Sequence, residues 1–234
     1  MGNISEIVRK LLNGAVVSRF VLRNHIYSFQ TEMKAVAFTF DDGPSPETTR
    51  RLVDLFVQNG GKASFFFQGN RVEEYPDVVK YAHAHAFTIA NHSYDHCSYD
   101  EVGWKEMLSQ LRQTNVLLQR ITGETTKFMR PPKNRITQWE TVVVKARCDM
   151  HIVNANLAPT DWVMTDAEKL ELLLLQNVYP GTIACLHDNS LCTVEALASV
   201  LPKLREKGYA FLSLDEMMQM AEPSPYRRYN VNYN

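Results

Sequence analysis

The feature that most constrains the fold of this chain is a regular alternation of short β-prone segments with helical segments. Such alternation is typical of βαβ units, whose successive strands lie parallel in one sheet. About seven strands over about two hundred residues favour an α/β fold, a single-domain distorted (β/α) barrel with its active site at the C-terminal strand ends. The expected strands are 35–40, 62–67, 87–90, 127–130, 150–153, 181–186 and 209–212, and the expected helices are 47–58, 76–85, 102–121, 137–146, 166–178, 194–207 and 215–220.

Length and composition indicate one domain. With 234 residues, of which 45% are hydrophobic and 22% charged, the chain is large enough for one well-buried core. We expect a lead-in segment at 1–33, with a short helix around Ser5–Leu12 and then extended chain, a domain at 34–220 and a tail at 221–234.

Charge and hydropathy exclude several classes of partner. The formal net charge of −1 gives no electrostatic reason to expect nucleic acid. No stretch is apolar for long enough to cross a bilayer, and the segment 15–22, interrupted by Arg19, is a poor signal-peptide core. The four cysteines include no Cys-x-x-Cys pair, so buried thiols are favoured over disulfides or zinc–sulfur ligation. The oligomeric state is not predicted.

Two adjacent acids follow the first strand of the expected barrel. The β-forming run 35–40 leads into Asp41 and Asp42, and Gly43-Pro44 ends the strand. Two carboxylates at the end of a buried strand are costly unless a cation, hydrogen-bond donors or a shared proton balances them. A solvated Asp-Asp-Gly turn is the alternative for this motif when it stands alone.

A pair of histidines follows the strand expected at 87–90. His92 and His96 are four residues apart, and on a helical turn both rings would point the same way and could hold one metal ion. A carboxylate is a common third ligand in hydrolytic metal sites that keep one position for water. Asp41 and Asp42 could then have different roles, with one binding the metal and the other taking a proton from water.

Three further polar motifs follow expected strands or lie on a loop after one. Arg130 ends the strand at 127–130, where an arginine keeps a neighbouring carboxylate ionised and oriented, although alone it would more often be a surface residue. Asp161-Trp162 lies on a loop, and His187-Asp188 follows the strand at 181–186. A histidine there can act as general acid, and an aspartate nearby can hold it protonated and aligned.

In this order the motifs resemble those of the polysaccharide deacetylases of the NodB-homology group, carbohydrate esterase family 4, which includes chitin and peptidoglycan deacetylases. The resemblance extends from about Val36 to Met217. The matching segments are Thr39-Phe-Asp-Asp-Gly-Pro44, His92-Ser-Tyr-Asp-His96, Arg130-Pro-Pro132, Asp161-Trp162 and His187-Asp188, with further similarity at Lys62–Phe66, Ile121–Gly123, Lys207–Tyr209 and Leu214–Glu216.

The resemblance implies a metal centre and a general base. Asp42, His92 and His96 would bind a divalent metal, usually zinc, with cobalt as a common substitute. Asp41 would be the general base toward the attacking water, and Arg130 would brace it.

The resemblance also implies roles for residues around the leaving group and the acetyl group. His187 would protonate the departing amine, and Asp161 would tune His187. The backbone N–H of Lys133 would stabilise the oxyanion together with the metal. Trp162 would wall the pocket that receives the acetyl methyl group.

The sequence departs from the family's pattern near the expected substrate pocket. Lys133 and Asn134 stand where the third motif normally has tyrosine and glycine, so the backbone donor is kept while the aromatic wall is lost. Cys185 stands where the family has a leucine that lines the acetyl pocket. Because residues two apart on a strand share a face, Cys185 is expected on the same face as His187.

The expected function is therefore metal-dependent removal of N-acetyl groups from a β-1,4-linked N-acetylglucosamine polymer, with chitin slightly favoured over peptidoglycan. The alternatives are O-deacetylation of another acetylated glycan and a catalytically retired member that binds wall carbohydrate. Retention of both acids, both metal histidines, the arginine and the distal histidine argues against the retired member. The family implies an acetylated polysaccharide as partner and a secreted or cell-surface location, and no signal peptide is visible in the sequence.

Overall fold

The computed structural model describes residues 21–226, and the helix expected around Ser5–Leu12 lies outside them. Each expected strand and helix between residues 35 and 220 is present, with its ends shifted by at most three residues. The strands are β1 (His25–Ile26), β2 (Ser28–Gln30), β3 (Ala35–Gly43), β4 (Ser64–Phe67), β5 (Thr88–Asn91), β6 (Phe128–Met129), β7 (His151–Val153), β8 (Thr182–His187), β9 (Ala210–Phe211) and β10 (Glu222–Ser224). The helices are α3 (Thr49–Gln58), α4 (Gly69–Glu74), α5 (Pro76–Ala84), α6 (Tyr99–Thr122), α7 (Gln138–Cys148), α8 (Ala167–Asn177), α9 (Leu191–Glu206) and α10 (Leu214–Met220), with short 3-10 turns η1 (Pro132–Asn134) and η2 (Asp161–Val163).

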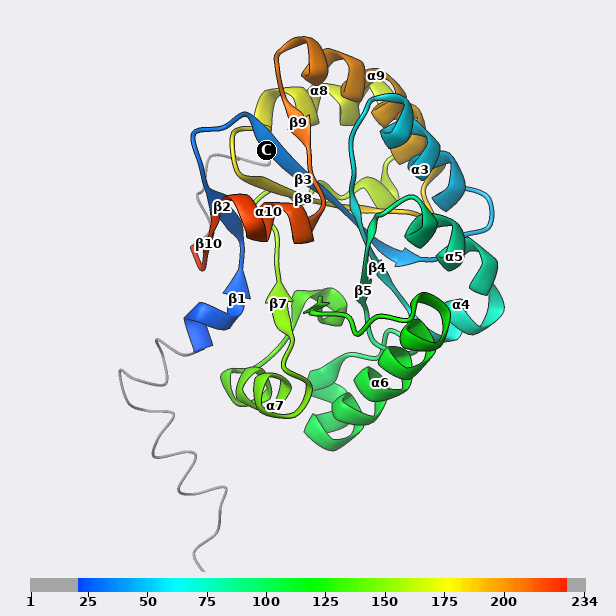
Figure 1. Ribbon diagram of the computed structural model, residues 1–234, viewed down its shortest axis with the longest axis vertical. Helices are drawn as coiled ribbons and strands as arrows, with labels where there is room; N and C mark the ends of the chain where they lie inside the picture. The colour runs from blue at the N-terminus through cyan, green and yellow to red at the C-terminus, as the bar shows by residue number, and fades with distance from the viewer. Residues whose placement is uncertain (1–20, 227–234) are drawn as a thin grey trace, which may run out of the picture.

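The strands form one sheet with a long parallel run (Figure 1). Its order is β1-β7-β6-β5-β4-β3-β8, and every neighbouring pair in this run is parallel. β2 and β10 continue the sheet beyond β8 as antiparallel strands, and β9 pairs in parallel with β3. The expected parallel α/β barrel is confirmed, with an antiparallel addition that the alternation of segments did not predict.

The sheet curls until its two ends almost meet. β1 and β2 are separated in sequence by Tyr27 alone, yet they lie near opposite ends of the strand order. The backbone N–H of Tyr27 donates to the carbonyl oxygen of Ser224 in β10 at 2.9 Å. The barrel is therefore nearly closed on the side where the chain enters and leaves it.

Segments outside the expected domain limits contribute to this closure. β1 and β2 lie in the lead-in expected at 1–33, and β10 lies in the tail expected at 221–234. The domain limits at residues 34 and 220 stay a prediction, and these three strands lie outside them.

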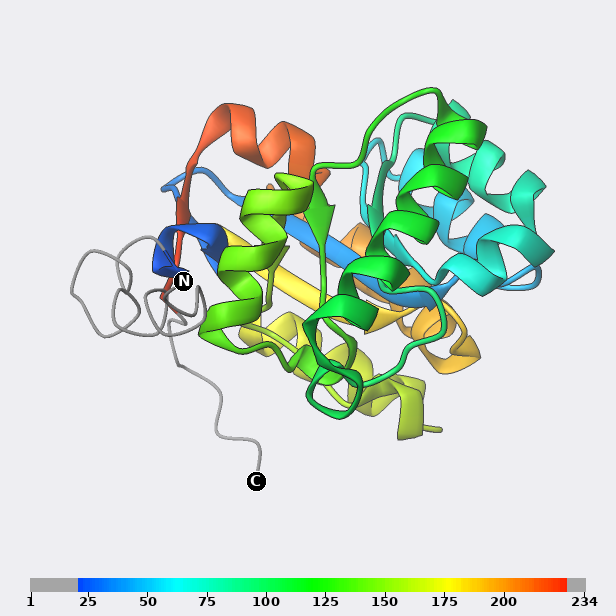
Figure 2. The ribbon, with the colours of Figure 1, turned by 90° about the horizontal axis from the view of Figure 1, so that it is seen from below.

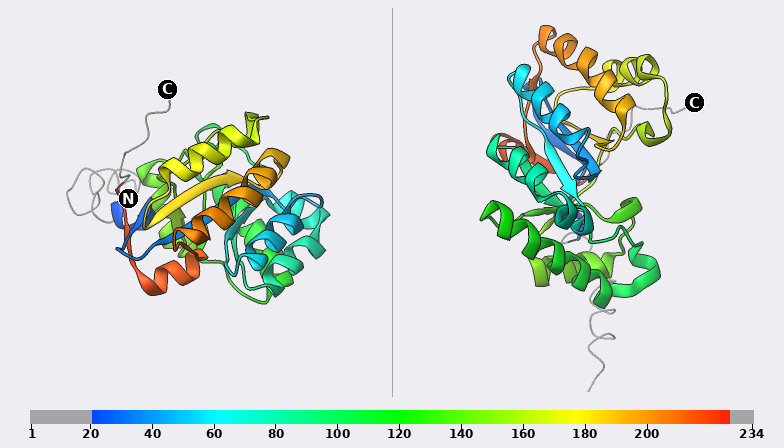
Figure 3. Two further views of the ribbon diagram at one scale, coloured as in Figure 1. Left: turned by 90° about the horizontal axis from the view of Figure 1, so that it is seen from above. Right: turned by 90° about the vertical axis from the view of Figure 1, so that its right-hand side faces the viewer.

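The helices form a layer outside the sheet. α8 packs against α9, α9 against α3, α3 against α5, α5 against α6 and α6 against α7. Figure 2 shows α6 and α7 side by side, and Figure 3 shows α8 beside α9. No helix formed by residues 21–226 is long and apolar enough to cross a membrane.

Alternation along β3 decides which side chains face the barrel interior. Phe38 and Phe40 face outward and pack edge-on against Phe56 of α3, with ring centroids 5.6 and 5.8 Å away. Ala37, the residue before Phe38, belongs to the inner apolar cluster. Because side chains alternate along a strand, Asp41 falls on the inner face, at the carboxyl end of the barrel.

Candidate active site

The carboxyl ends of β3, β5 and β8 meet around one cavity of about 710 Å³. Because parallel strands all end at the same edge of the barrel, the polar motifs that follow them are brought together there. The cavity is lined by Asp41, Asp42, His92, His96, Pro131, Lys133, Asn134, Ala158, Trp162, Cys185, His187, Asn189 and Ser190.

Asp42, His92 and His96 form a group suited to a metal ion. Their candidate ligand atoms all lie within 4.8 Å of one another, and each histidine Nε2 lies 3.5 Å from Asp42 Oδ1. The carbonyl oxygen of Arg130 accepts a hydrogen bond from His92 Nδ1 at 2.8 Å, which leaves Nε2 as the free ligand nitrogen. One carboxylate and two imidazoles are a donor set that zinc accepts.

The two histidines reach this position without the helical turn expected from their spacing. Residues 92–98 form a loop between β5 and α6. Within it Ser93 and His96 have φ values of 69° and 63°. The expected helical turn is therefore wrong, because left-handed residues break the helical path and fold the chain back instead.

Asp41 is a buried carboxylate held by a buried arginine. Its Oδ1 accepts a hydrogen bond from Arg130 at 2.6 Å, and its Oδ2 lies 3.3 Å from the thiol of Cys185. Burial by itself raises the pKa of Asp41, but the charge of Arg130, with that of His92, outweighs it and holds the pKa below its usual range. Asp41 is therefore ionised at neutral pH.

Asp42 has a left-handed backbone, with φ at 70°. Gln68, directly after β4, donates from Nε2 to Asp42 Oδ1 at 2.7 Å and from its backbone N–H to the carbonyl of Gly43 at 2.8 Å. Burial raises the pKa of Asp42, but the hydrogen bond to His92 and the nearby histidine charges lower it well below its usual value. Gln68 is not among the site residues expected from the sequence, although, like several of them, it is a polar residue at the end of a strand.

His187 is paired with Asp161. His187 Nδ1 lies 2.8 Å from Asp161 Oδ1, and the backbone N–H of His187 donates to Asp161 Oδ2 at 2.8 Å. Thr193 of α9 donates to the same Oδ2 at 2.6 Å, so the buried Asp161 is fixed from two elements. Burial lowers the pKa of His187, but the hydrogen bond and the charges of the nearby aspartates raise it above its usual value.

The expected substrate-binding residues lie on the walls of the cavity. Trp162 is 55% exposed, and its ring stands edge-on to His187 with centroids 4.6 Å apart. Cys185 is buried and lines the cavity, on the same face of β8 as His187. Lys133 lies in η1 with φ at 56°, and its Nζ forms an ion pair with Glu101 at 3.7 Å.

Asp188 is a buried acid beside Gly43, at the carboxyl end of β3. Thr49 donates to its Oδ2 at 2.6 Å, whereas its Oδ1 has no hydrogen-bond partner in the described part of the chain. A Cβ atom at Gly43 would come within 1.9 Å of Asp188 Oδ2, so only glycine leaves room for the carboxyl group. Burial raises the pKa of Asp188 to about 7.

This pKa predicts that the metal-free protein loses stability as the pH rises. The unfolded carboxyl group has a pKa of about 4. The folded value is the higher one, so the contribution of Asp188 is complete below pH ~4 and is lost as the pH rises through about 7. The total loss is up to about 4 kcal/mol of unfolding free energy. We expect Asp188→Asn to flatten the decline in urea midpoint between pH 4.5 and 8, and an unchanged slope would contradict the assignment.

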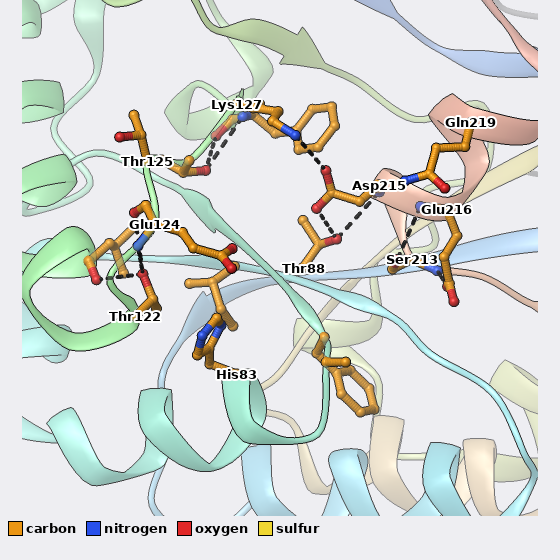
Figure 4. A pocket seen from close by; sticks show the side chains of 16 residues that line it. His83, Thr88, Thr122, Glu124, Thr125, Lys127, Ser213, Asp215, Glu216 and Gln219 are labelled. Carbon is orange, nitrogen blue, oxygen red and sulfur yellow. Dashed lines mark hydrogen bonds and ion pairs between the residues drawn. The ribbon is translucent and has the colours of Figure 1, made fainter.

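A second cavity, of about 540 Å³, lies at the opposite end of the sheet, near the amino ends of β5 and β6 (Figure 4). Its polar side chains largely bind one another. Thr88 donates to Asp215 at 2.8 Å, Lys127 forms an ion pair with Asp215 at 3.6 Å, and Ser213 and Glu216 form a capping box. The cavity brings together none of the candidate catalytic residues, so the site at the carboxyl ends is the functional candidate.

Comparison with known proteins identifies the family. Residues 29–151 match the family model described as polysaccharide deacetylase. A peptidoglycan-N-acetylglucosamine deacetylase of Bacillus cereus is 32% identical over 195 residues, which cover 80% of this chain and 69% of that protein. The chain belongs to the polysaccharide deacetylase family.

Other members show how varied the family is. A chitooligosaccharide deacetylase of Azorhizobium caulinodans is 26% identical, over 77% of this chain and 92% of that protein. The solved structure of the Bc1960 peptidoglycan N-acetylglucosamine deacetylase is 30% identical, with a TM-score of 0.82, over 88% of this chain and 98% of that one. BA3943 of Bacillus anthracis, described as a CE4 family pseudoenzyme, is 25% identical, with a TM-score of 0.77, over 83% of this chain and 68% of that one.

Proposed function

We propose that this protein is a metal-dependent deacetylase that removes N-acetyl groups from a β-1,4-linked N-acetylglucosamine polymer and releases acetate. The observation that carries the proposal is the meeting, at one cavity, of three candidate metal ligands, an ionised buried carboxylate and a histidine–aspartate pair. Amide hydrolysis at neutral pH needs an electrophile, a base and an acid, and this set offers one of each.

Peptidoglycan is the first candidate polymer. The relative at 32% identity and the solved structure at 30% identity are both named peptidoglycan N-acetylglucosamine deacetylases. The chitooligosaccharide deacetylase is less similar, at 26% identity. We therefore place chitin, which the sequence slightly favoured, second. A wall polymer as substrate also supports a secreted or cell-surface location.

Asp42, His92 and His96 would hold the divalent cation, with zinc first and cobalt second. When bound, such an ion supplies Lewis acidity, which lowers the pKa of water and polarises a carbonyl oxygen. The chain's own contribution is orientation. Gln68 holds the carboxylate of Asp42, and the carbonyl of Arg130 holds the ring of His92.

Asp41 would accept the proton of the attacking water. Arg130 occupies Oδ1, so the proton would go to Oδ2, which lies 3.9 Å from His92 Nε2 and accepts only a weak hydrogen bond from the Cys185 thiol at 3.3 Å. The salt bridge keeps the carboxylate charged and fixes its orientation, which are the two properties that a general base needs.

His187 would return a proton to the departing amine. Its Nδ1 is engaged by Asp161, so Nε2 is the nitrogen that faces the cavity, 3.9 Å from Asp42 Oδ2. The raised pKa favours the protonated ring, as a general acid requires.

The backbone N–H of Lys133 would donate to the oxyanion, a contribution of ~3 kcal/mol for a positioned donor. Trp162 and Cys185 would wall the acyl pocket.

Two alternatives use the same cavity. The water that attacks an amide can also attack an ester, so these residues do not separate N- from O-deacetylation. The pseudoenzyme among the relatives makes a retired member the second alternative. Here the base, the acid, their partners and the three candidate ligands all meet at the cavity, which favours an active enzyme.

The test is acetate release from N-acetylated peptidoglycan and from a chitin oligomer, by protein stripped of metal and then restored with zinc or cobalt. We expect no release without metal and recovery with either ion, with faster release from peptidoglycan. Release that persists in the metal-free protein would refute metal dependence. Absence of release from every acetylated polymer with metal bound would favour the retired member.

A further inference from the structure

The loop between the two candidate metal histidines has an unfavourable backbone. Ser93 and His96 both lie in the left-handed region, with φ values of 69° and 63°. A non-glycine residue in such a region costs roughly 1–3 kcal/mol unless its surroundings hold it there. Some group outside the loop must therefore hold this conformation, and with it the spacing of the two rings.

Gln110 of α6 is the side chain that contacts this loop most extensively. It is buried, and its Oε1 accepts hydrogen bonds from the backbone N–H of Tyr94 at 3.0 Å and of Asp95 at 3.1 Å, and from the hydroxyl of Ser93 at 3.2 Å. Because a backbone N–H can only donate, the atom that faces the loop must be the amide oxygen, which fixes the orientation of the side chain.

The amide nitrogen of Gln110 is held equally well. It donates to Asp95 Oδ2 and to Glu106 Oε1, both at 3.2 Å. Gln110 thus forms hydrogen bonds with both the backbone N–H and the side-chain carboxylate of Asp95. An amide suits this position because it offers an acceptor to two N–H groups and a donor to two carboxylates.

The carbonyl groups of the loop are bound by other elements. The N-terminus of α4 provides two donors: the N–H of Gly69 reaches the carbonyl of Ser93 at 3.0 Å, and that of Asn70 reaches the carbonyl of Tyr94 at 2.9 Å. Thr114, one turn beyond Gln110 on α6, also donates to the carbonyl of Ser93 at 2.9 Å. α4 and α6 pack together around the loop (Figure 1). These donors bind the carbonyl oxygens of the loop, whereas Gln110 accepts from its backbone N–H groups.

We propose that Gln110 is a positioning residue that sets the metal affinity of the site by holding His92 and His96 at their spacing. The inference rests on the proposed metal centre. It adds a residue that belongs to none of the sequence motifs and stands fourteen positions after the nearer expected ligand, His96. Without the amide, the N–H groups of Tyr94 and Asp95 lose their acceptor, and the loop can relax toward ordinary backbone angles. Removing a group that orients metal ligands typically lowers metal affinity about 10–100-fold.

The main test variant is Gln110→Met, which keeps the length of the side chain and removes its hydrogen bonds. We expect its Kd for zinc, measured by competition with a chelator, to rise at least tenfold over wild type. With cobalt, the visible absorption spectrum should change, because the ligand geometry relaxes. Gln110→Glu keeps an acceptor for the two N–H groups but faces two carboxylates, so its Kd should lie between those of wild type and Gln110→Met.

Two controls on α6 separate positioning from general loss of stability. Gln119→Ala removes an exposed glutamine and should leave both Kd and spectrum unchanged. Leu118→Ala removes a buried leucine and should destabilise the fold by about 2–5 kcal/mol without changing the zinc Kd. All binding is measured at a temperature where each variant is folded.

The outcomes distinguish this inference from the function on which it rests. Wild-type protein that binds neither zinc nor cobalt would refute the metal centre, and the role of Gln110 with it. Wild-type binding with an unchanged Kd in Gln110→Met would overturn the inference alone. An equal loss of affinity in Leu118→Ala would overturn it too, because the effect would then follow stability rather than loop position.

Discussion

Replacing Asp41 with asparagine is expected to lower kcat for acetate release by about 10²–10⁴-fold, the contribution typical of a positioned general base. Asparagine keeps the shape of the side chain and an oxygen that can accept from Arg130, but its amide does not take a proton at neutral pH. The KM should change little, because the carboxylate acts on water rather than on the sugar. Steady-state acetate release on the zinc-loaded enzyme measures both parameters.

Metal content is the control for this variant. Asp41 is not among the three candidate ligands, so Asp41→Asn should bind zinc nearly as well as wild type. Asp42→Ala serves as the contrast, because it removes a candidate ligand and should lose metal and activity together. An Asp41→Asn enzyme with more than a tenth of wild-type kcat would show that another group acts as the base.

The strands and helices were predictable wherever local pattern and tertiary environment agree. In β3, the outward Phe38 and Phe40 alternate with the inward Ala37, and the strand stays apolar because both faces are covered. β1 and β10 were not predicted, because they lie outside the alternation of strands and helices that identified the equally short β6 and β9. Their pairing is decided by contact with distant segments, as between Tyr27 and Ser224.

The candidate site was predictable for a topological reason. Polar residues directly after parallel strands must gather at one edge, so Asp41, His92, Arg130 and His187 were expected together and lie together. The residues that hold them were harder to find. Gln110 stands inside a long polar helix, where its sequence context resembles that of any solvated glutamine, and only the packing of α6 on the loop distinguishes it.

The Arg130–Asp41 pair shows why such sites are sensitive to single substitutions. Arg130 is fully buried and lies over the ring of Phe66, with its Cζ 4.3 Å from the ring centroid. It also donates to Thr39 at 2.9 Å and to two backbone carbonyls, those of Val153 and Asn154. A buried charge is tolerated only while such partners remain, so each member of the pair depends on the other.

Arg130→Met is therefore expected to lower the unfolding free energy of the metal-free protein by about 3–5 kcal/mol at pH 7, because it leaves Asp41 charged, buried and unpaired. The double variant Asp41→Asn/Arg130→Met should recover part of that loss, because no uncompensated charge remains. It should stay less stable than wild type, since Thr39 and the two carbonyls lose their donor. Urea unfolding of the wild type, both single variants and the double variant gives the coupling energy, expected at about 1–3 kcal/mol. Additive losses would show that the two charges do not stabilise each other, and the base would then owe its ionised state to another group.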